Sequence, residues 1–167
     1  MAAPLIFFAK IHTNASNEVR LYMNKIELIL LKKQEDEELA IIKENYSKPA
    51  VERFVDINKD TFWTYVTETE NVHFYKVYNE GILSGTVQCE VYDGVLYLAL
   101  VVFPEYQNNG IGTDIVKFII DGNTRLDFNE IRVSVDEKNT ASMRLFQNAG
   151  FIKIGQKDEL VDLQYIM

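Results

Sequence analysis

A strongly apolar segment, Val95–Val102, is followed by a short polar stretch and then by two closely spaced glycines, Gly110 and Gly112. Such a segment is typical of a central strand covered on both faces, and the apolar spacing after the glycines predicts a helix. The first turn of a helix has backbone N–H groups without internal partners, and these attract anions. Because glycine has no side chain, a diphosphate can approach this backbone closely. Gln107 and Asn108 add side-chain donors.

The same segment excludes two common nucleotide sites. It lacks the Gly-Lys-Ser/Thr sequence of P-loop hydrolases. It also lacks the third glycine of a dinucleotide-binding turn, because position 115 is Ile. The pair of glycines alone is also compatible with an ordinary strand–helix turn, so further residues are needed to identify a ligand.

The rest of the chain predicts an α/β fold with a mixed sheet. Alternation of apolar and polar residues and the Asp93-Gly94 hairpin signal indicate an antiparallel meander, which leads into crossover helices. Strands are expected at 25–32, 72–78, 82–92, 95–102, 130–135, 151–157 and 160–167, and helices near 39–46, 62–66, 110–125 and 139–149.

The chain of 167 residues suits one globular domain. We expect that domain to span residues 23–167, after an N-terminal extension at 1–22. Residues 4–11 of the extension are apolar and allow three interpretations: an extra strand, a partner-binding arm or a start-site artefact.

Composition narrows the classes of partner. The net charge of −8 argues against general nucleic-acid binding, which needs clustered Lys and Arg. It suits a cationic acceptor, although excess acid also serves solubility. No apolar run approaches the roughly 20 residues of a membrane span, and no secretory signal is recognisable, so a cytoplasmic location is expected. Cys89 is the only cysteine, which excludes an internal disulfide.

A second motif, Asn139-Thr-Ala-Ser-Met-Arg-Leu-Phe-Gln-Asn-Ala-Gly-Phe151, follows the strand expected at 130–135. Together with Gln107-x-x-Gly110-x-Gly112 it resembles the GNAT superfamily of N-acetyltransferases. The two blocks are similar to the family's (Gln/Arg)-x-x-Gly-x-(Gly/Ala) loop and its Asn-x-x-Ala-x-x-Leu-(Tyr/Phe)-x-x-x-Gly-Phe helix. The resemblance extends over about 25–167 in element order and is strongest over 96–151. It implies a mostly antiparallel sheet that splays into a V-shaped cleft, flanked by about four helices.

The resemblance also implies how a donor is held. Acetyl-CoA is the expected donor substrate, no metal is expected, and a homodimer is a common assembly in the family. The donor-binding positions that it implies are Val101, Val102 and Phe103 for the pantetheine arm, Gln107, Asn108, Asn109, Gly110, Ile111 and Gly112 for the pyrophosphate, and Thr113, Asn139 and Phe146 beside them. Asn139 also fits a helix N-cap, and both roles are compatible.

The catalytic groups do not follow the family pattern. Many members have a tyrosine that protonates the departing thiolate where this chain has Phe146. Tyr106 and Tyr165 are substitutes for that acid, or packing aromatics. The central strand lacks an acidic residue, so Glu90 is the candidate base, with Glu105 a weaker one; a solvated surface role is the alternative for Glu90.

Two further side chains are read as structural. His73 is interpreted as a strand residue, and Cys89 as a buried inert thiol. Phe62, Trp63 and Tyr65 form an aromatic group that either lines an acceptor pocket or packs in the core.

Three functional hypotheses follow. The first is an N-acetyltransferase in which the primary amine of a small molecule or peptide attacks acetyl-CoA directly. The second is an acyl-CoA-binding or regulatory module with little catalysis, motivated by Phe146 and the missing acid. The third is an unrelated α/β protein that binds another phosphate ligand.

Overall fold

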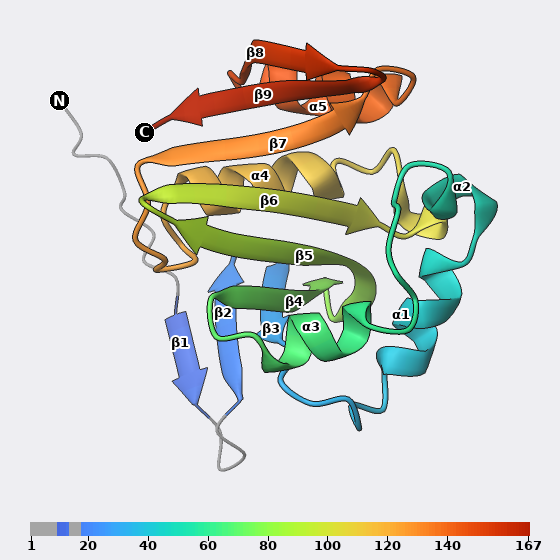
Figure 1. The fold of residues 1–167 in the computed structure, drawn as a ribbon. Coiled ribbons are helices and arrows are strands. Elements are labelled where there is room, and N and C mark those ends of the chain that lie inside the picture. Colours follow the sequence, from blue (N-terminus) through green and yellow to red (C-terminus); the bar gives the residue numbers. More distant parts are fainter. Residues whose placement is uncertain (1–9, 14–17) are drawn as a thin grey trace, which may run out of the picture.

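The computed structural model describes residues 10–13 and 18–167 (Figure 1). Its strands are β1 (Lys10–Thr13), β2 (Val19–Met23), β3 (Ile26–Leu30), β4 (Val72–Asn79), β5 (Ile82–Tyr92), β6 (Val95–Val102), β7 (Glu130–Asp136), β8 (Ile152–Lys157) and β9 (Leu160–Ile166). Its helices are α1 (Leu39–Tyr46), α2 (Pro49–Glu52), α3 (Phe62–Glu68), the 3-10 turn η1 (Pro104–Tyr106), α4 (Ile111–Ile120) and α5 (Thr140–Asn148).

The strands form one nine-stranded sheet in the order β1-β2-β3-β4-β5-β6-β7-β9-β8. Neighbours pair antiparallel except β6 and β7, which are parallel because α4 crosses over between them. Asp93 and Gly94, with φ of 50° and 77°, turn β5 into β6 as the hairpin signal predicted. The mixed, mostly antiparallel sheet expected from the sequence is confirmed.

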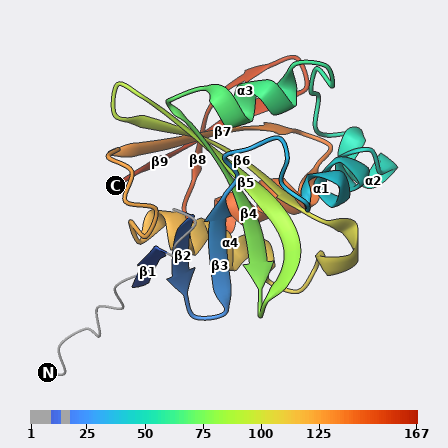
Figure 2. The same cartoon turned by 90° about the horizontal axis from the view of Figure 1, so that it is seen from below.

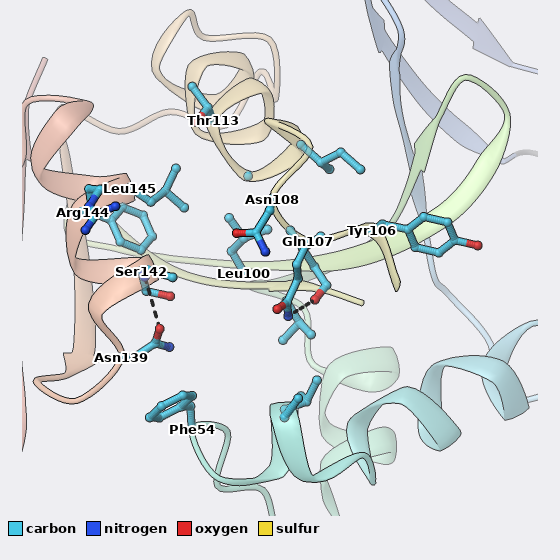
Figure 3. Close-up of a pocket in the computed structure, with 18 of the residues that line it drawn as sticks. Phe54, Leu100, Tyr106, Gln107, Asn108, Thr113, Asn139, Ser142, Arg144 and Leu145 are labelled. Carbon is cyan, nitrogen blue, oxygen red and sulfur yellow. Dashed lines mark hydrogen bonds between the residues drawn. The ribbon is translucent and has the colours of Figure 1, made fainter. Parts of the chain in front are cut away.

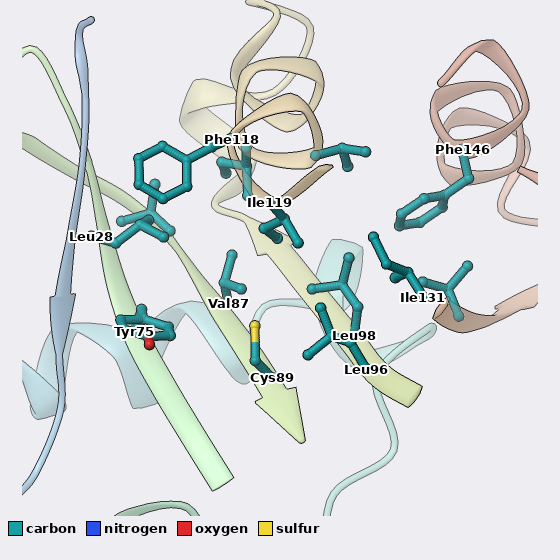
Figure 4. Packing of buried hydrophobic residues seen from close by; sticks show 14 of the residues in the cluster. Leu28, Tyr75, Val87, Cys89, Leu96, Leu98, Phe118, Ile119, Ile131 and Phe146 are labelled. Atoms are coloured by element: carbon teal, nitrogen blue, oxygen red, sulfur yellow. The ribbon is translucent and has the colours of Figure 1, made fainter. Parts of the chain in front are cut away.

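Helices cover both faces of the sheet. Figures 1 and 2 show α4 and α5 on one face and α3 on the other. One apolar cluster lies between the sheet and α4, where Val87 and Leu98 face Phe118 and Ile119 (Figure 4). A second cluster joins α1 and α3 to the opposite face; its buried members are Leu31, Leu39, Ile42, Tyr46, Val51, Trp63, Val66, Val72, Phe74, Val101 and Phe103.

The two faces of β5 differ along its length. Cys89 is fully buried in the first cluster, as its alternation predicted. The opposite face was expected to be polar, yet Ser84 and Thr86 on it are also buried, and the Tyr46 hydroxyl lies 2.8 Å from Thr86 Oγ1. Gln88 and Glu90 on this face are partly buried, and Ile82 and Tyr92 at the two ends of the strand are exposed.

The N-terminal strands belong to the same sheet. β2 pairs with β3, and its Leu21 is buried in the first cluster. The domain boundary expected between residues 22 and 23 falls inside β2, a strand of the same sheet. The segment expected at 4–11 lies mostly outside the described residues; residues 10 and 11 are in β1.

One helix is shorter than expected. The sequence pattern extended the helix after Gly110 to about residue 125, but α4 ends at Ile120. Gly122 has φ of 75°, and the backbone N–H and side-chain amide of Asn123 both donate to Phe118 O at 3.2 Å. These contacts close the helix with a turn. In the described part of the chain, no helix is both long and apolar enough for a membrane span.

Candidate donor cleft and acceptor cavity

The parallel pairing of β6 with β7 is short. In the described ladder, Val95–Tyr97 pair with Glu130–Arg132, and the rest of β6 continues without a partner in β7. β7 itself goes on pairing with β9 as far as Asp136. The sheet therefore splits after Tyr97, at the strand that leads to the predicted anion site.

The ladder fixes which backbone groups of β6 point into this split. Phe103 N donates to Ser84 O at 2.9 Å, so Phe103 faces β5. Because polar groups alternate sides along an antiparallel strand, Val101 faces β5 as well, while Leu100 and Val102 face away from it, toward the split. Of the three strand positions that the family resemblance implied, Val102 has its backbone N–H and C=O turned toward the split, as does Leu100. Val101 also lines the cavity at this strand end.

The N-terminus of α4 continues directly from this strand end. Gly110 is its N-cap with φ of 78°, a conformation that favours glycine. The first helical bond runs from Asp114 N to Gly110 O at 3.0 Å. For the amides of Ile111, Gly112 and Thr113, no hydrogen-bond acceptor is found among the described residues. Three adjacent N–H groups are therefore free to bind an anion.

Helix packing, as well as the approach of a ligand, explains why position 112 is a glycine. A Cβ at this position would lie 3.1 Å from Leu145 Cδ2, so the glycine lets α4 and α5 come close. At Gly110 a Cβ would meet no atom within 4 Å, and the constraint there is the backbone conformation.

The loop before α4 is held by its own side chains. Gln107 Nε2 donates to Val102 O at 2.9 Å, and Asn109 Nδ2 donates to Gln107 O at 3.2 Å. Asn108 has φ of 62° and lies beside Gln107 in the close-up of the cavity (Figure 3). The side-chain amide of Gln107 was expected to donate a hydrogen bond to an anion. In this structure it donates to the backbone carbonyl at the end of β6.

A cavity of about 360 Å³ joins the strand end, the α4 N-terminus and α5 (Figure 3). Of the described residues that line it, Arg53 and Arg144 are the charged ones. A cationic lining in a chain of net charge −8 favours a polyanionic ligand. Arg53 stacks on Phe54 at 4.5 Å, and Phe54 lies across the cavity from α5. Arg53 belongs to no recognisable motif and Arg144 occupies a variable position of the second one, so the sequence did not single them out.

Asn139 lies at the N-terminus of α5 and lines the same cavity. Its Oδ1 accepts from Ser142 N at 3.1 Å, which is the N-cap bond expected from its position (Figure 3). The amide nitrogen of the side chain donates to no other described residue and is available as a donor.

The ring of Phe146 is buried against Phe151, with ring centroids 5.1 Å apart. Tyr165 packs on the other side of Phe151 at 5.4 Å, so it serves as a packing aromatic. Tyr106 is on the cavity lining, but its ring points away from Asn139 and Leu145 in Figure 3. Of the two tyrosines that the sequence offered as acids, Tyr165 is therefore engaged in packing and Tyr106 points away from α5.

A second cavity, of about 670 Å³, lies where β6 and β7 part, and Glu90 lines it. The Tyr65 hydroxyl donates to Glu90 Oε2 at 2.9 Å, and the amide of Gln88 donates to Oε1. Burial, together with the hydrogen bond to Glu90, raises the pKa of Tyr65 to about 12, so the phenol remains a donor. Both bonds hold the Glu90 carboxylate in place at the cavity wall.

The remaining candidates lie elsewhere. Glu105 forms an exposed ion pair with Lys48, which lowers the pKa of Glu105. Burial raises the pKa of Cys89 to about 12 and lowers the pKa of His73. Phe62 and Trp63 pack in the second cluster, whereas Tyr65 from the same helix reaches Glu90. Within residues 10–13 and 18–167, no group of three or more potential metal ligands gathers.

A split mixed sheet with a helix N-terminus at the mouth of the split defines a class of proteins that hold a phosphate-bearing donor between two strands. The family model described as "Acetyltransferase (GNAT) family" matches residues 37–151. The chain therefore belongs to the GNAT family of acetyltransferases, as its two motifs predicted.

Solved structures share the fold at low identity. The N-acetyltransferase PseH of Campylobacter jejuni is 14% identical with a TM-score of 0.68, over 86% of this chain and 99% of that one. The spermidine N-acetyltransferase of Vibrio cholerae is 15% identical with a TM-score of 0.71, over 85% and 95%. RimL, a ribosomal L7/L12 α-N-protein acetyltransferase, is 11% identical with a TM-score of 0.73, over 95% and 100%. No protein with a curated function matches the chain in sequence.

Proposed function

We propose that the protein transfers the acetyl group of acetyl-CoA to the primary amine of an acceptor by direct attack. The observation that carries this proposal is the continuity of one acid-free cavity from the unpaired edge of β6 to the free amides of α4. The membership of the GNAT family supports the same reaction.

In this proposal the donor lies along the cavity, from the strand end to the start of α4. The pantetheine arm runs along β6 and pairs with the polar backbone groups of Leu100 and Val102, as a peptide adds to a sheet edge. The pyrophosphate binds the amides at the start of α4, and Arg53 and Arg144 add positive charge. PseH has been solved with acetyl coenzyme A, and the Vibrio cholerae enzyme with CoA and spermine.

The acceptor enters the second cavity, on the opposite face of the sheet from α4. Glu90 takes a proton from the ammonium group, and the neutral nitrogen then attacks the thioester carbonyl carbon. The nitrogen of the tetrahedral intermediate loses its extra proton to water, and the intermediate collapses to an amide with cleavage of the C–S bond. The CoA thiolate then takes a proton from water, since Phe146 cannot donate one and Tyr106 points away.

Two measurements test the proposal. Thermal melting with acetyl-CoA, CoA and ATP should show stabilisation by the two CoA compounds but not by ATP. Thiol release from acetyl-CoA with a panel of primary amines should then show turnover. No stabilisation by CoA compounds would overturn the donor site.

A binding module without catalysis is the second candidate, because a phenylalanine stands where many relatives have the acid. Stabilisation by acetyl-CoA without thiol release on any amine would favour that module over the enzyme.

A further inference from the structure

The second cavity has a composition of its own. Its polar lining residues alternate with the residues of the first cluster along β5, β6 and β7, so they belong to the other face of the sheet. Figure 1 shows α4 and α5 on the side of the first cluster. The cavity begins at Tyr97 and Arg132, the last pair that joins β6 to β7, so it lies at the apex of the split. The residues lining it are Gln88, Glu90, Tyr92, Tyr97, Leu98, Ala99, Arg132, Val133, Ser134, Ile154 and Asp162.

The charge of this cavity is negative. Glu90 and Asp162 are its two carboxylates. Arg132, the one cation of the described lining, forms an ion pair with Glu130, so the carboxylates at and beside the cavity outnumber its cation. A ligand with positive charge is therefore favoured, and a ligand carboxylate would meet two like charges.

The two carboxylates stand on different strands. Glu90 is on β5 and Asp162 is on β9, with β6 and β7 between them. Asp162 pairs with Ser134, two residues farther into the split than the Tyr97–Arg132 pair that continues the row of Glu90. Three strand spacings and this offset put the two backbones about 16 Å or more apart, so the carboxylates stand toward opposite ends of the cavity. Ser134 Oγ donates to Asp162 Oδ1 at 2.6 Å, which fixes the carboxylate. Asp162 Oδ2 accepts no hydrogen bond from any described residue, so it can bind a ligand.

Aromatic rings form part of the lining between these charges. Tyr92 and Tyr97 meet edge to face at 6.4 Å, and each is exposed by more than two-fifths, at 46% and 43%. Such rings accept both a methylene chain and an adjacent cation.

We propose that the acceptor is a linear aliphatic diamine without a carboxylate. This inference rests on the proposed function. One ammonium group binds Asp162 Oδ2, the chain lies against Tyr97, and the second ammonium group reaches Glu90. That group loses a proton to Glu90 and attacks the thioester, so one nitrogen becomes an amide while the other stays charged on Asp162.

Matched amines test the proposal with acetyl-CoA and the full chain. The probes are 1,5-diaminopentane, pentylamine, which lacks the second cation, and lysine, which adds a carboxylate to the same diamine. We expect kcat/KM for 1,5-diaminopentane to exceed that of each of the other two by about tenfold or more. Equal or better turnover of pentylamine or lysine would overturn the proposal.

A variant of Asp162 tests whether this residue causes the preference for the diamine over pentylamine. Asp162→Asn should reduce the ratio of kcat/KM for 1,5-diaminopentane over pentylamine to near one. The control Asp158→Asn makes the same change in the exposed β8–β9 turn, where φ of 52° suits asparagine, and should keep the wild-type ratio. A wild-type ratio in a folded Asp162→Asn protein would contradict the assignment.

A binding measurement separates this proposal from the proposed function. Calorimetry of 1,5-diaminopentane with the CoA-loaded protein should show binding that Asp162→Asn weakens by about tenfold. This result, without thiol release, would retain the diamine site and sink only the catalysis. Turnover of other amines, without any diamine preference, would do the reverse.

Discussion

At the scale of single residues, the side chains of Glu90 and Tyr106 point in different directions. Glu90 reaches the cavity at the apex of the split, where two donors hold it. Tyr106 lies on the other cavity with its ring turned outward (Figure 3). We therefore expect substitutions at these two candidate catalytic residues to have different effects on turnover.

Glu90→Gln keeps the shape of the side chain but removes the base. We expect kcat to fall by about 100-fold or more, with the dissociation constant of acetyl-CoA unchanged. Thiol release and calorimetry measure the two quantities. Glu105→Gln, which changes a carboxylate at the exposed ion pair with Lys48, is the matched control and should retain turnover. Wild-type kcat in Glu90→Gln would remove Glu90 as the base.

Tyr106→Phe removes a hydroxyl that points away from the donor cleft. We expect kcat to stay close to that of the wild type, because water supplies the proton to the thiolate. A fall in kcat of about tenfold or more, with unchanged acetyl-CoA affinity, would instead assign the acid to Tyr106.

At the scale of elements, the site depends on how closely α4 and α5 approach. Gly112→Ala places a Cβ against Leu145 and should cost about 1 kcal/mol of unfolding free energy. Gly112→Asp adds a negative charge beside the phosphates, so we expect acetyl-CoA affinity to fall about tenfold or more below that of Gly112→Ala. Calorimetry measures affinity, and melting confirms folding. Equal affinities of the two variants would place the phosphates elsewhere.

Two substitutions of Asn139, at the start of α5, separate its role as a helix cap from a role in binding the donor. Asn139→Ala loses the cap bond to Ser142 N and should cost about 1 kcal/mol of stability. Asn139→Ser keeps a capping oxygen but loses the side-chain amide. We expect it to melt near the wild type while binding acetyl-CoA about three- to tenfold more weakly. Full affinity in Asn139→Ser would leave Asn139 as a cap alone.

Local signals predicted most of these elements. Asp93-Gly94 and Asn139 were recognisable because a hairpin turn and a helix cap depend on neighbouring residues. Strand β2 was missed, because its status depends on pairing with β3. The partners of Glu90, and the places of Arg53 and Asp162, depend on elements distant in sequence, so no local pattern could reveal them.

At the scale of the whole molecule, Lys76 connects the segment before α1 to β4. Its Nζ donates to Asp36 Oδ2 at 2.8 Å and to Glu38 Oε2 at 2.9 Å, while the residue is only 5% exposed. Burial by itself lowers the pKa of Lys76, but the two carboxylates outweigh it and raise that pKa.

Lys76→Met should lower the free energy of unfolding by about 1 to 3 kcal/mol at neutral pH, because two carboxylates lose their partner. A raised pKa in the folded state means that this stabilisation is present at neutral pH and is lost as pH rises through that pKa. Denaturant unfolding of both proteins across alkaline pH measures it. A stability difference that grows with pH would contradict the expectation.

Because β6 pairs with β7 over only three residues, the rest of this edge of β6 has no partner in β7. Unpaired edges invite addition of another chain, and here a bound donor would play the part of the missing strand. Hydrogen exchange at the amides of Leu100 and Val102 would then slow when acetyl-CoA is present, while exchange at the amide of Phe103, already bonded to Ser84, would change less. Bound acetyl-CoA would thus supply the hydrogen bonds that the sheet lacks at this edge of β6.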